Sequence, residues 1–432
     1  MNTIKRFFAL ATLVLLLPGC LEAQEKTTEV LNLSDVTSIV RETRSGLWLV
    51  CNNSSGRSRF TLVDESLTSA DQLWLDYVDG TDSMRINDFE IFRDTVYFCG
   101  QIWYGDDSYG IWGYFPLNGF PSVDVYYNDV IGVSCHKLDV FSVDTTTIDL
   151  HVVLLGHMGD IDPDFVIDEV RLAPNFFTEN KSYIFDNVPL MFFYDVEVTD
   201  LHVAISTSAD NGSVLFINKP TTIGTTIFTC TITQDILNVP KIGIILLEYC
   251  KNNYLVAVYK YKSIRDIHLF GFSTTTPLDH LSIDGTEDLW PRDVKFNRAK
   301  DDLDLLATPL EWFSRGDSSM IYHLNYSLVA QGGPLFCHKY RDHKLNSLAW
   351  LSTRDKCFVA SGHDINQHYL KLYRYQFDYW GECTEEVFSF ARKQDVVEHQ
   401  KKPQIDFYHY NIQMLELESR DMNNPLKVTC GK

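Results

Sequence analysis

The chain has 432 residues, with 37 Lys and Arg against 58 Asp and Glu, a formal net charge of −21 and 45% hydrophobic residues. This apolar content excludes wholesale disorder, and the low counts of 23 Gly and 14 Pro exclude collagen-like and proline-rich chains. An acidic surface repels phosphate backbones, so the composition also argues against nucleic-acid binding.

The first 23 residues resemble a secretory signal peptide. Lys5 and Arg6 precede an apolar run over residues 7–17, and Cys20 and Ala23 follow it. The run has 11 residues, too few for a transmembrane helix, which needs about 20. We expect cleavage after Ala23, which leaves residues 24–432 as the exported protein. In the alternative, residues 17–20 form a lipobox and Cys20 carries a lipid anchor.

The exported part reads as β-strand nearly throughout, and one unit of strand, polar turn and strand recurs along it. A third strand often follows in the same unit. The second strands of successive units are expected to begin about 50 residues apart, which is the size of a four-stranded propeller blade. These predicted second strands begin near Leu47, Val96, Leu150, Leu201, Leu255, Leu303 and Cys357.

This repeat predicts an all-β protein, namely a single β-propeller domain of about four antiparallel strands per blade. We count seven blades, and six or eight are also compatible with the spacing. Sheets stacked around a ring bury both of their apolar faces. The C-terminal segment 395–432 is expected to complete ring closure in a blade shared with residues 29–33, and residues 384–394 form a short helix or an edge strand. The alternative, a row of sandwich domains, would show a period near 100 residues.

The stretch from Ile86 to Gly100 (INDFEIFRDTVYFCG), the signal peptide and the fifty-residue period together resemble uncharacterised exported β-propeller proteins of Bacteroidales-type bacteria. The resemblance covers most of the exported part. Because the WD dipeptide and the kelch glycine doublets are missing, it does not extend to those families. The resemblance implies a propeller fold and export, and it carries no catalytic residues.

Cysteine spacing argues against a zinc site. The chain has ten cysteines, and no two of them form a C-x-x-C pair. An exported protein meets an oxidising compartment, so some cysteines are candidates for disulfides. We expect Cys51, Cys99 and Cys357 to be buried thiols inside strands.

The densest run of carboxylates contains Asp160, Asp162 and Asp164. Oxygens at alternate positions can hold Ca²⁺, although Phe165 and Arg171 break the EF-hand pattern. A solvated acidic loop is the competing interpretation. Calcium is therefore the one cofactor that the sequence suggests.

Four aromatic residues in or beside predicted loops are candidates for ligand binding, because an exposed ring can stack on a sugar or anchor a partner protein. Packing between blades is the alternative role. The four residues are Trp103, Tyr104, Trp290 and Trp312.

The sequence favours a non-catalytic exported propeller that binds a protein or glycan at the cell envelope, in the periplasm, at the cell surface or outside the cell. The alternative is a glycosidase-like carbohydrate-active enzyme on the same scaffold, with acids around the central channel. A third option is a structural subunit of an envelope complex. Convergent inward carboxylates or arginines would favour the enzyme, whereas an apolar aromatic rim would favour binding. Contact with a membrane is expected only through a lipid on Cys20.

Overall fold

The computed structural model describes the strands given below. It also describes the turn residues 43–47, 56, 93–94, 105–106, 117, 123, 132, 199–201, 252, 260, 266, 286, 288 and 317. All described secondary structure is β-strand, and every strand pair is antiparallel. No described residue belongs to a helix long and apolar enough to cross a membrane.

Seven sheets follow one another in chain order, and we number them 1 to 7. Each is a meander in which consecutive strands pair. Sheet 1 contains β2 (Thr37–Glu42), β3 (Trp48–Ser54), β4 (Arg57–Val63) and β5 (Ser69–Tyr77). Sheet 2 contains β6 (Ser83–Phe92), β7 (Thr95–Tyr104), β8 (Asp107–Pro116) and β9 (Asp124–Asn128). Sheet 3 contains β10 (Val133–Ser142), β11 (Leu150–Met158), β12 (Asp164–Ala173) and β13 (Phe176–Ile184).

The remaining sheets repeat this plan. Sheet 4 contains β14 (Phe193–Val198), β15 (His202–Thr207), β16 (Ser213–Asn218) and β17 (Ile227–Thr231). Sheet 5 contains β18 (Ile244–Lys251), β19 (Tyr254–Tyr259), β20 (Ile267–Ser273) and β21 (Thr276–Ile283). Sheet 6 contains β22 (Leu289–Asn297), β23 (Asp302–Pro309), β24 (Ser318–Asn325) and β25 (Phe336–Arg341). Sheet 7 contains β26 (His343–Trp350), β27 (Cys357–Asp364) and β28 (Leu370–Gln376).

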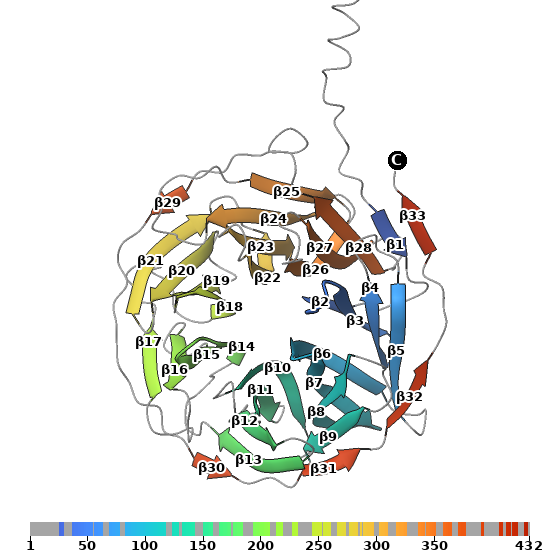
Figure 1. Ribbon diagram of the computed structural model, residues 1–432. Coiled ribbons are helices and arrows are strands. Elements are labelled where there is room, and N and C mark those ends of the chain that lie inside the picture. The colour runs from blue at the N-terminus through green and yellow to red at the C-terminus, as the bar shows by residue number, and fades with distance from the viewer. Residues whose placement is uncertain are drawn as a thin grey trace, which may run out of the picture.

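The sheets are arranged around a common centre, which gives the molecule a propeller-like form (Figure 1). The first strand of each sheet lies nearest the centre and contacts the first strand of the next sheet, and β26 of sheet 7 contacts β2 of sheet 1. The predicted all-β fold with repeated antiparallel sheets is therefore confirmed. The second strands begin within a residue of their predicted positions, although Leu201 precedes β15 and is 48% exposed.

Apolar side chains fill the space between neighbouring sheets. Between sheets 1 and 2, the ring of Phe60 packs edge-on against Phe89 and Phe115, with centroids 5.3 and 5.0 Å apart. Similar clusters of buried residues join sheets 2 and 3, sheets 4 and 5, and sheets 5 and 6. Because each strand alternates its side chains between two faces, a sheet in the ring can bury both faces against its neighbours.

The C-terminal segment runs back around the outside of the sheets, and we call its four strands the belt. They are β29 (Phe390–Arg392), β30 (Asp406–Tyr408), β31 (Ile412–Leu415) and β32 (Leu417–Asp421). They pair with β21, β13, β9 and β5, the outer strands of sheets 5, 3, 2 and 1. After the belt, β33 (Lys427–Cys430) pairs with β1 (Lys26–Glu29) in a separate two-stranded sheet.

A tight hairpin turn joins β6 to β7. At the turn between β6 and β7, Arg93 and Asp94 have φ of 50° and 60°, and Phe92 pairs with Thr95. Two central residues with positive φ are the mark of a type I′ turn, whose twist matches that of the flanking strands. Asp tolerates this region better than most residues, which explains the turn locally.

The predicted buried thiols are confirmed at two positions. Cys51 and Cys99 are buried in β3 and β7, and Cys135 and Cys250 are two further buried cysteines. Cys357 begins β27, and its side chain lies outside the described part.

Candidate functional site

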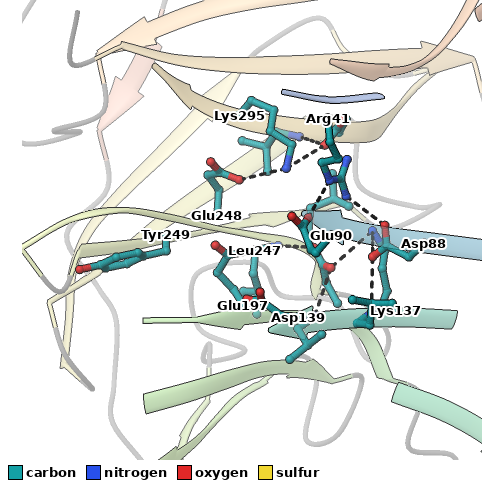
Figure 2. A pocket seen from close by; sticks show the side chains of 16 residues that line it. Arg41, Asp88, Glu90, Lys137, Asp139, Glu197, Leu247, Glu248, Tyr249 and Lys295 are labelled. Carbon is teal, nitrogen blue, oxygen red and sulfur yellow. Dashed lines mark hydrogen bonds and ion pairs between the residues drawn. The ribbon is translucent and has the colours of Figure 1, made fainter. Parts of the chain in front are cut away.

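A cavity of about 170 Å³ lies where the first strands of sheets 1 to 6 converge, and we call it the central cavity. Its charged lining comprises seven carboxylates and three cations (Figure 2). The carboxylates are Asp88, Glu90, Asp139, Asp195, Glu197, Glu248 and Asp293, and the cations are Arg41, Lys137 and Lys295.

A recurring backbone feature aims these side chains inward. The ladder between the first two strands is irregular at one place in sheets 2, 3, 4, 6 and 7 and at two places in sheet 5, and at each place the register skips one residue of the first strand. Asn87 is such a residue, and Asp88 and Glu90 follow it. A β-bulge bends its strand and redirects the side chains that follow. The repeated irregularity therefore places charged side chains from separate sheets at the same level of the centre.

These carboxylates join neighbouring sheets through backbone N–H groups of the next first strand. Leu138 N donates to Asp88 Oδ2 (3.5 Å), and Leu247 N donates to Asp195 Oδ2 (2.8 Å). These bonds link sheet 2 to sheet 3 and sheet 4 to sheet 5. Leu348 N donates to Asp293 Oδ2 (2.8 Å) and links sheet 6 to sheet 7.

The other junctions are made in the same zone. Val198 N donates to Asp139 Oδ2 (2.6 Å), and Phe296 N donates to Glu248 Oε1 (2.8 Å). Val40 N donates to Ser347 Oγ (3.3 Å) and joins sheet 1 to sheet 7. The ion pairs of Arg41 join sheet 1 to sheet 2. With these bonds and ion pairs, each of the seven sheets is linked to both of its neighbours.

Each of the three cations contacts two carboxylates of the cavity. Arg41 bonds Glu90 Oε1 (2.6 Å) and Asp88 Oδ1 (3.0 Å). Lys137 lies 3.6 Å from both Asp88 and Asp195, and Lys295 lies 3.5 Å from Glu248 and 3.8 Å from Asp293. Burial alone would lower the pKa of Lys137, but Asp195 and Asp88 outweigh it and raise that pKa. The three cations therefore stay charged.

Glu197 differs from the other carboxylates. Within the described part of the chain, no hydrogen bond or ion pair is recorded for its carboxylate, and the side chain lies at the cavity beside Glu248 and Asp139 (Figure 2). Burial, then the charges of Glu248 and Asp139, raise the pKa of Glu197 well above its usual range. Burial and the charge of Glu90 raise the pKa of Asp139 to about 7. Both shifts favour the protonated carboxyl in the folded protein.

The first strands carried a signal for this site that the sequence analysis did not use. Four of them contain a charged, an apolar and a charged residue in succession. The four are Asp88-Phe89-Glu90, Lys137-Leu138-Asp139, Asp195-Val196-Glu197 and Asp293-Val294-Lys295. Alternate residues of a strand share one face, so each pair of charges points the same way.

The predicted aromatic residues do not meet at this site. Trp103 and Tyr104 end β7 and are half-buried, with the Tyr104 ring packed on Tyr109 at 5.7 Å. Trp290 is half-buried near the start of β22, the strand of sheet 6 nearest the centre of the molecule, and it lies opposite Thr308. Trp312 lies outside the described residues. Tyr249 is the aromatic residue that lines the cavity.

The predicted calcium loop and lipidation site lie mostly outside the described residues. Asp160, Asp162 and Cys20 are not described, and Asp164 is the first residue of β12, with no described side chain. Among the side chains that are described, no group of three or more His, Cys, Asp or Glu is placed to hold a metal ion.

Comparison with known proteins shows a likeness in fold only. No family model matches the chain, and no curated protein sequence matches it. The structure of Sqt1 from Chaetomium thermophilum is similar with a TM-score of 0.44 and 15% identity, over 76% of this chain and 79% of that one. A chain in the S. cerevisiae structure of Dbp5 bound to Nup159, Gle1, IP6 and ADP has a TM-score of 0.36 and 7% identity, over 82% of this chain and 96% of that chain.

Proposed function

We propose that this chain is a closed seven-bladed propeller that acts as a non-catalytic binding protein, and that its central cavity receives a cationic group of the partner. The observation that carries the proposal is the surplus of carboxylates, seven against three cations, around one small cavity. The inter-sheet links described above support ring closure and the blade number. A crystal structure tests the number of blades directly.

The size of the cavity favours a small cationic group. Sites for small molecules typically measure about 300–1,000 Å³, whereas this cavity measures about 170 Å³. An ammonium or guanidinium group needs little volume, donates several hydrogen bonds and matches the Glu197 carboxylate. A lysine or arginine side chain of a partner protein, or an amino group on a glycan, carries such a group.

Binding of a cation should release protons, because the raised pKa values of Glu197 and Asp139 favour their protonated carboxyls. We expect N-acetyl-lysinamide or N-acetyl-argininamide to give saturable heat in calorimetry, with an apparent enthalpy that depends on the ionisation enthalpy of the buffer. A Glu197→Gln variant should weaken binding at least tenfold, whereas Asp200→Asn, at an exposed turn residue, should not. Equal affinity in both variants, or no saturable heat in the wild type, contradicts the proposal.

We further propose export to the cell envelope, on the basis of residues 1–23 and the resemblance to exported propellers. The partner there is a protein or a glycan, and Cys20 is the candidate lipid anchor. Amino-terminal sequencing of the exported protein distinguishes cleavage after Ala23 from a blocked, lipidated Cys20. Pull-down from envelope fractions and a glycan array test the two kinds of partner. Calcium binding at Asp160, Asp162 and Asp164 stays a prediction for calorimetry.

A glycosidase-like enzyme is the second candidate, and one observation favours it. Convergent carboxylates line the cavity, and two of them have raised pKa values: burial raises the pKa of Glu197 well above its usual range and that of Asp139 to about 7. Glycoside hydrolysis needs one protonated and one ionised carboxyl group. Release of methylumbelliferone from a panel of glycosides, lost in Glu197→Gln and kept in Asp200→Asn, would establish this alternative.

A further inference from the structure

The belt is joined to the sheets by short ladders. β29 and β30 each form three residue pairs, β31 forms four and β32 forms five. In sheet 2 the ladders nearer the centre are longer, with nine pairs between β6 and β7 and ten between β7 and β8, whereas the outer ladder between β8 and β9 has four. Short ladders at an outer edge open locally at a smaller free-energy cost than long central ones. The belt can therefore leave the sheets while the sheets stay folded.

The belt also covers its acceptor strands incompletely. β13 has nine residues and pairs with β30 only through Ser182, Tyr183 and Ile184. β21 has eight residues and pairs with β29 only through Leu281, Ser282 and Ile283. An unpaired strand edge is a template for another strand. The outer edges of sheets 1, 2, 3 and 5 are thus acceptors whose preferred occupant is already known, because it is this chain's own C-terminal segment.

We propose that the belt exchanges between two copies of this chain, so that β29–β32 of one copy pair with β21, β13, β9 and β5 of the other. Exchange of an identical element repeats contacts that already exist, so it requires no new complementary surface. Residues 377–389 connect β28 to the belt, and 13 residues can span up to about 45 Å. The inference is independent of the proposed ligand of the central cavity.

An engineered disulfide between the belt and sheet 1 distinguishes exchange from other kinds of dimer. Ser419 of β32 lies directly opposite Leu75 of β5. Opposite residues of an antiparallel pair have Cα atoms about 4.5–5.5 Å apart, within the range for a disulfide. We propose the double variant Leu75→Cys with Ser419→Cys in the full chain. The matched control is Arg85→Cys with Gln101→Cys, a directly opposed pair inside sheet 2.

The test starts from the dimer fraction of the full chain, collected by size exclusion with light scattering at high protein concentration. After oxidation, the Leu75→Cys, Ser419→Cys dimer should run as a covalent dimer on a non-reducing gel, and the control as a monomer. Oxidising the monomer first should lower dimer formation at least tenfold, and reduction should restore it. Any of three results overturns the proposal. The chain stays monomeric at every concentration, the disulfide of the dimer forms within each chain, or the disulfide does not form.

Hydrogen exchange of the unmodified full chain provides a second readout. Amides of β30 and β32 should exchange at least tenfold faster than amides of β7 and β11. Equal protection would mean that the belt opens only with the whole fold, and exchange between copies would then be excluded under native conditions.

Discussion

Replacing Asp139 by Asn tests the electrostatics of the central cavity. Burial, with the nearby charge of Glu90, raises the pKa of the Asp139 carboxyl from its ordinary 3.8 to about 7. Because the folded state holds this proton more tightly than the unfolded chain, the stabilisation is fully present below about pH 4 and is lost as the pH rises through about 7. Three pH units correspond to roughly 4 kcal/mol at 1.36 kcal/mol per unit. The side chain is half-buried, so water reduces this toward about 2 kcal/mol.

The free energy of unfolding should be measured in urea between about pH 4 and 8, for the wild type, Asp139→Asn and the control Asp200→Asn. The Asn side chain keeps an oxygen that can accept the hydrogen bond from Val198 N. We expect the wild type to lose about 2–4 kcal/mol relative to Asp139→Asn across this range, since only the wild type deprotonates there. Because the charge of Asp139 also raises the pKa of Glu197, the difference reports Asp139 together with its electrostatic effect on Glu197. Parallel profiles would refute the reasoning.

Three further changes test the packing and the links around the centre. Arg41→Met should cost about 3–5 kcal/mol in urea unfolding because Asp88 and Glu90 lose their partner, whereas the exposed Arg44→Met should change stability by less than about 0.5 kcal/mol. Gly100→Ala should lower stability by about 2–3 kcal/mol in thermal unfolding, because its Cβ would overlap the carbonyl oxygen of Arg85. Gly105→Ala, at φ +61° with open space around it, should cost only about 1 kcal/mol; equal losses for the two glycines would contradict this packing. Ellman's reagent should react with four buried thiols only as the protein unfolds, namely those of Cys51, Cys99, Cys135 and Cys250. Rapid reaction in the native state would contradict their burial.

The repeat was accessible to sequence analysis because it is a local property. The second strands β11 and β27 were expected to begin near Leu150 and Cys357, and the structure begins them at these two residues. Alternating apolar residues and polar turns depend only on near neighbours in the chain. The tail shows the limit of such reasoning. Residues 384–394 suggested a short helix or an edge strand, and β29 is a three-residue edge strand whose position depends on β21, more than 100 residues earlier.

The central cavity was missed because it is assembled from positions about 50 residues apart. We interpreted the acidic charge as a property of the surface, and the structure instead places seven carboxylates of the first strands around the central cavity. Asp88 and Glu90 belong together in the sequence, but their partner Arg41 lies 47 and 49 positions before them. No pattern among neighbouring residues predicts that these strands meet at one centre.

The sequence by itself determined that the chain folds as repeated antiparallel sheets, because strand propensity, turn residues and the repeat of about 50 residues can all be recognised along the chain. It also determined the surplus of negative charge, through 58 acidic against 37 basic residues. Only the tertiary structure decided where part of that charge is used. The bulged first strands bring Asp139, Glu197 and Glu248 together at low solvent exposure, where repulsion and desolvation raise their pKa values. Carboxylates distributed over the surface would be solvated and screened. At the centre, burial and mutual repulsion favour the protonated carboxyl, and we propose that a cationic group of the partner binds there.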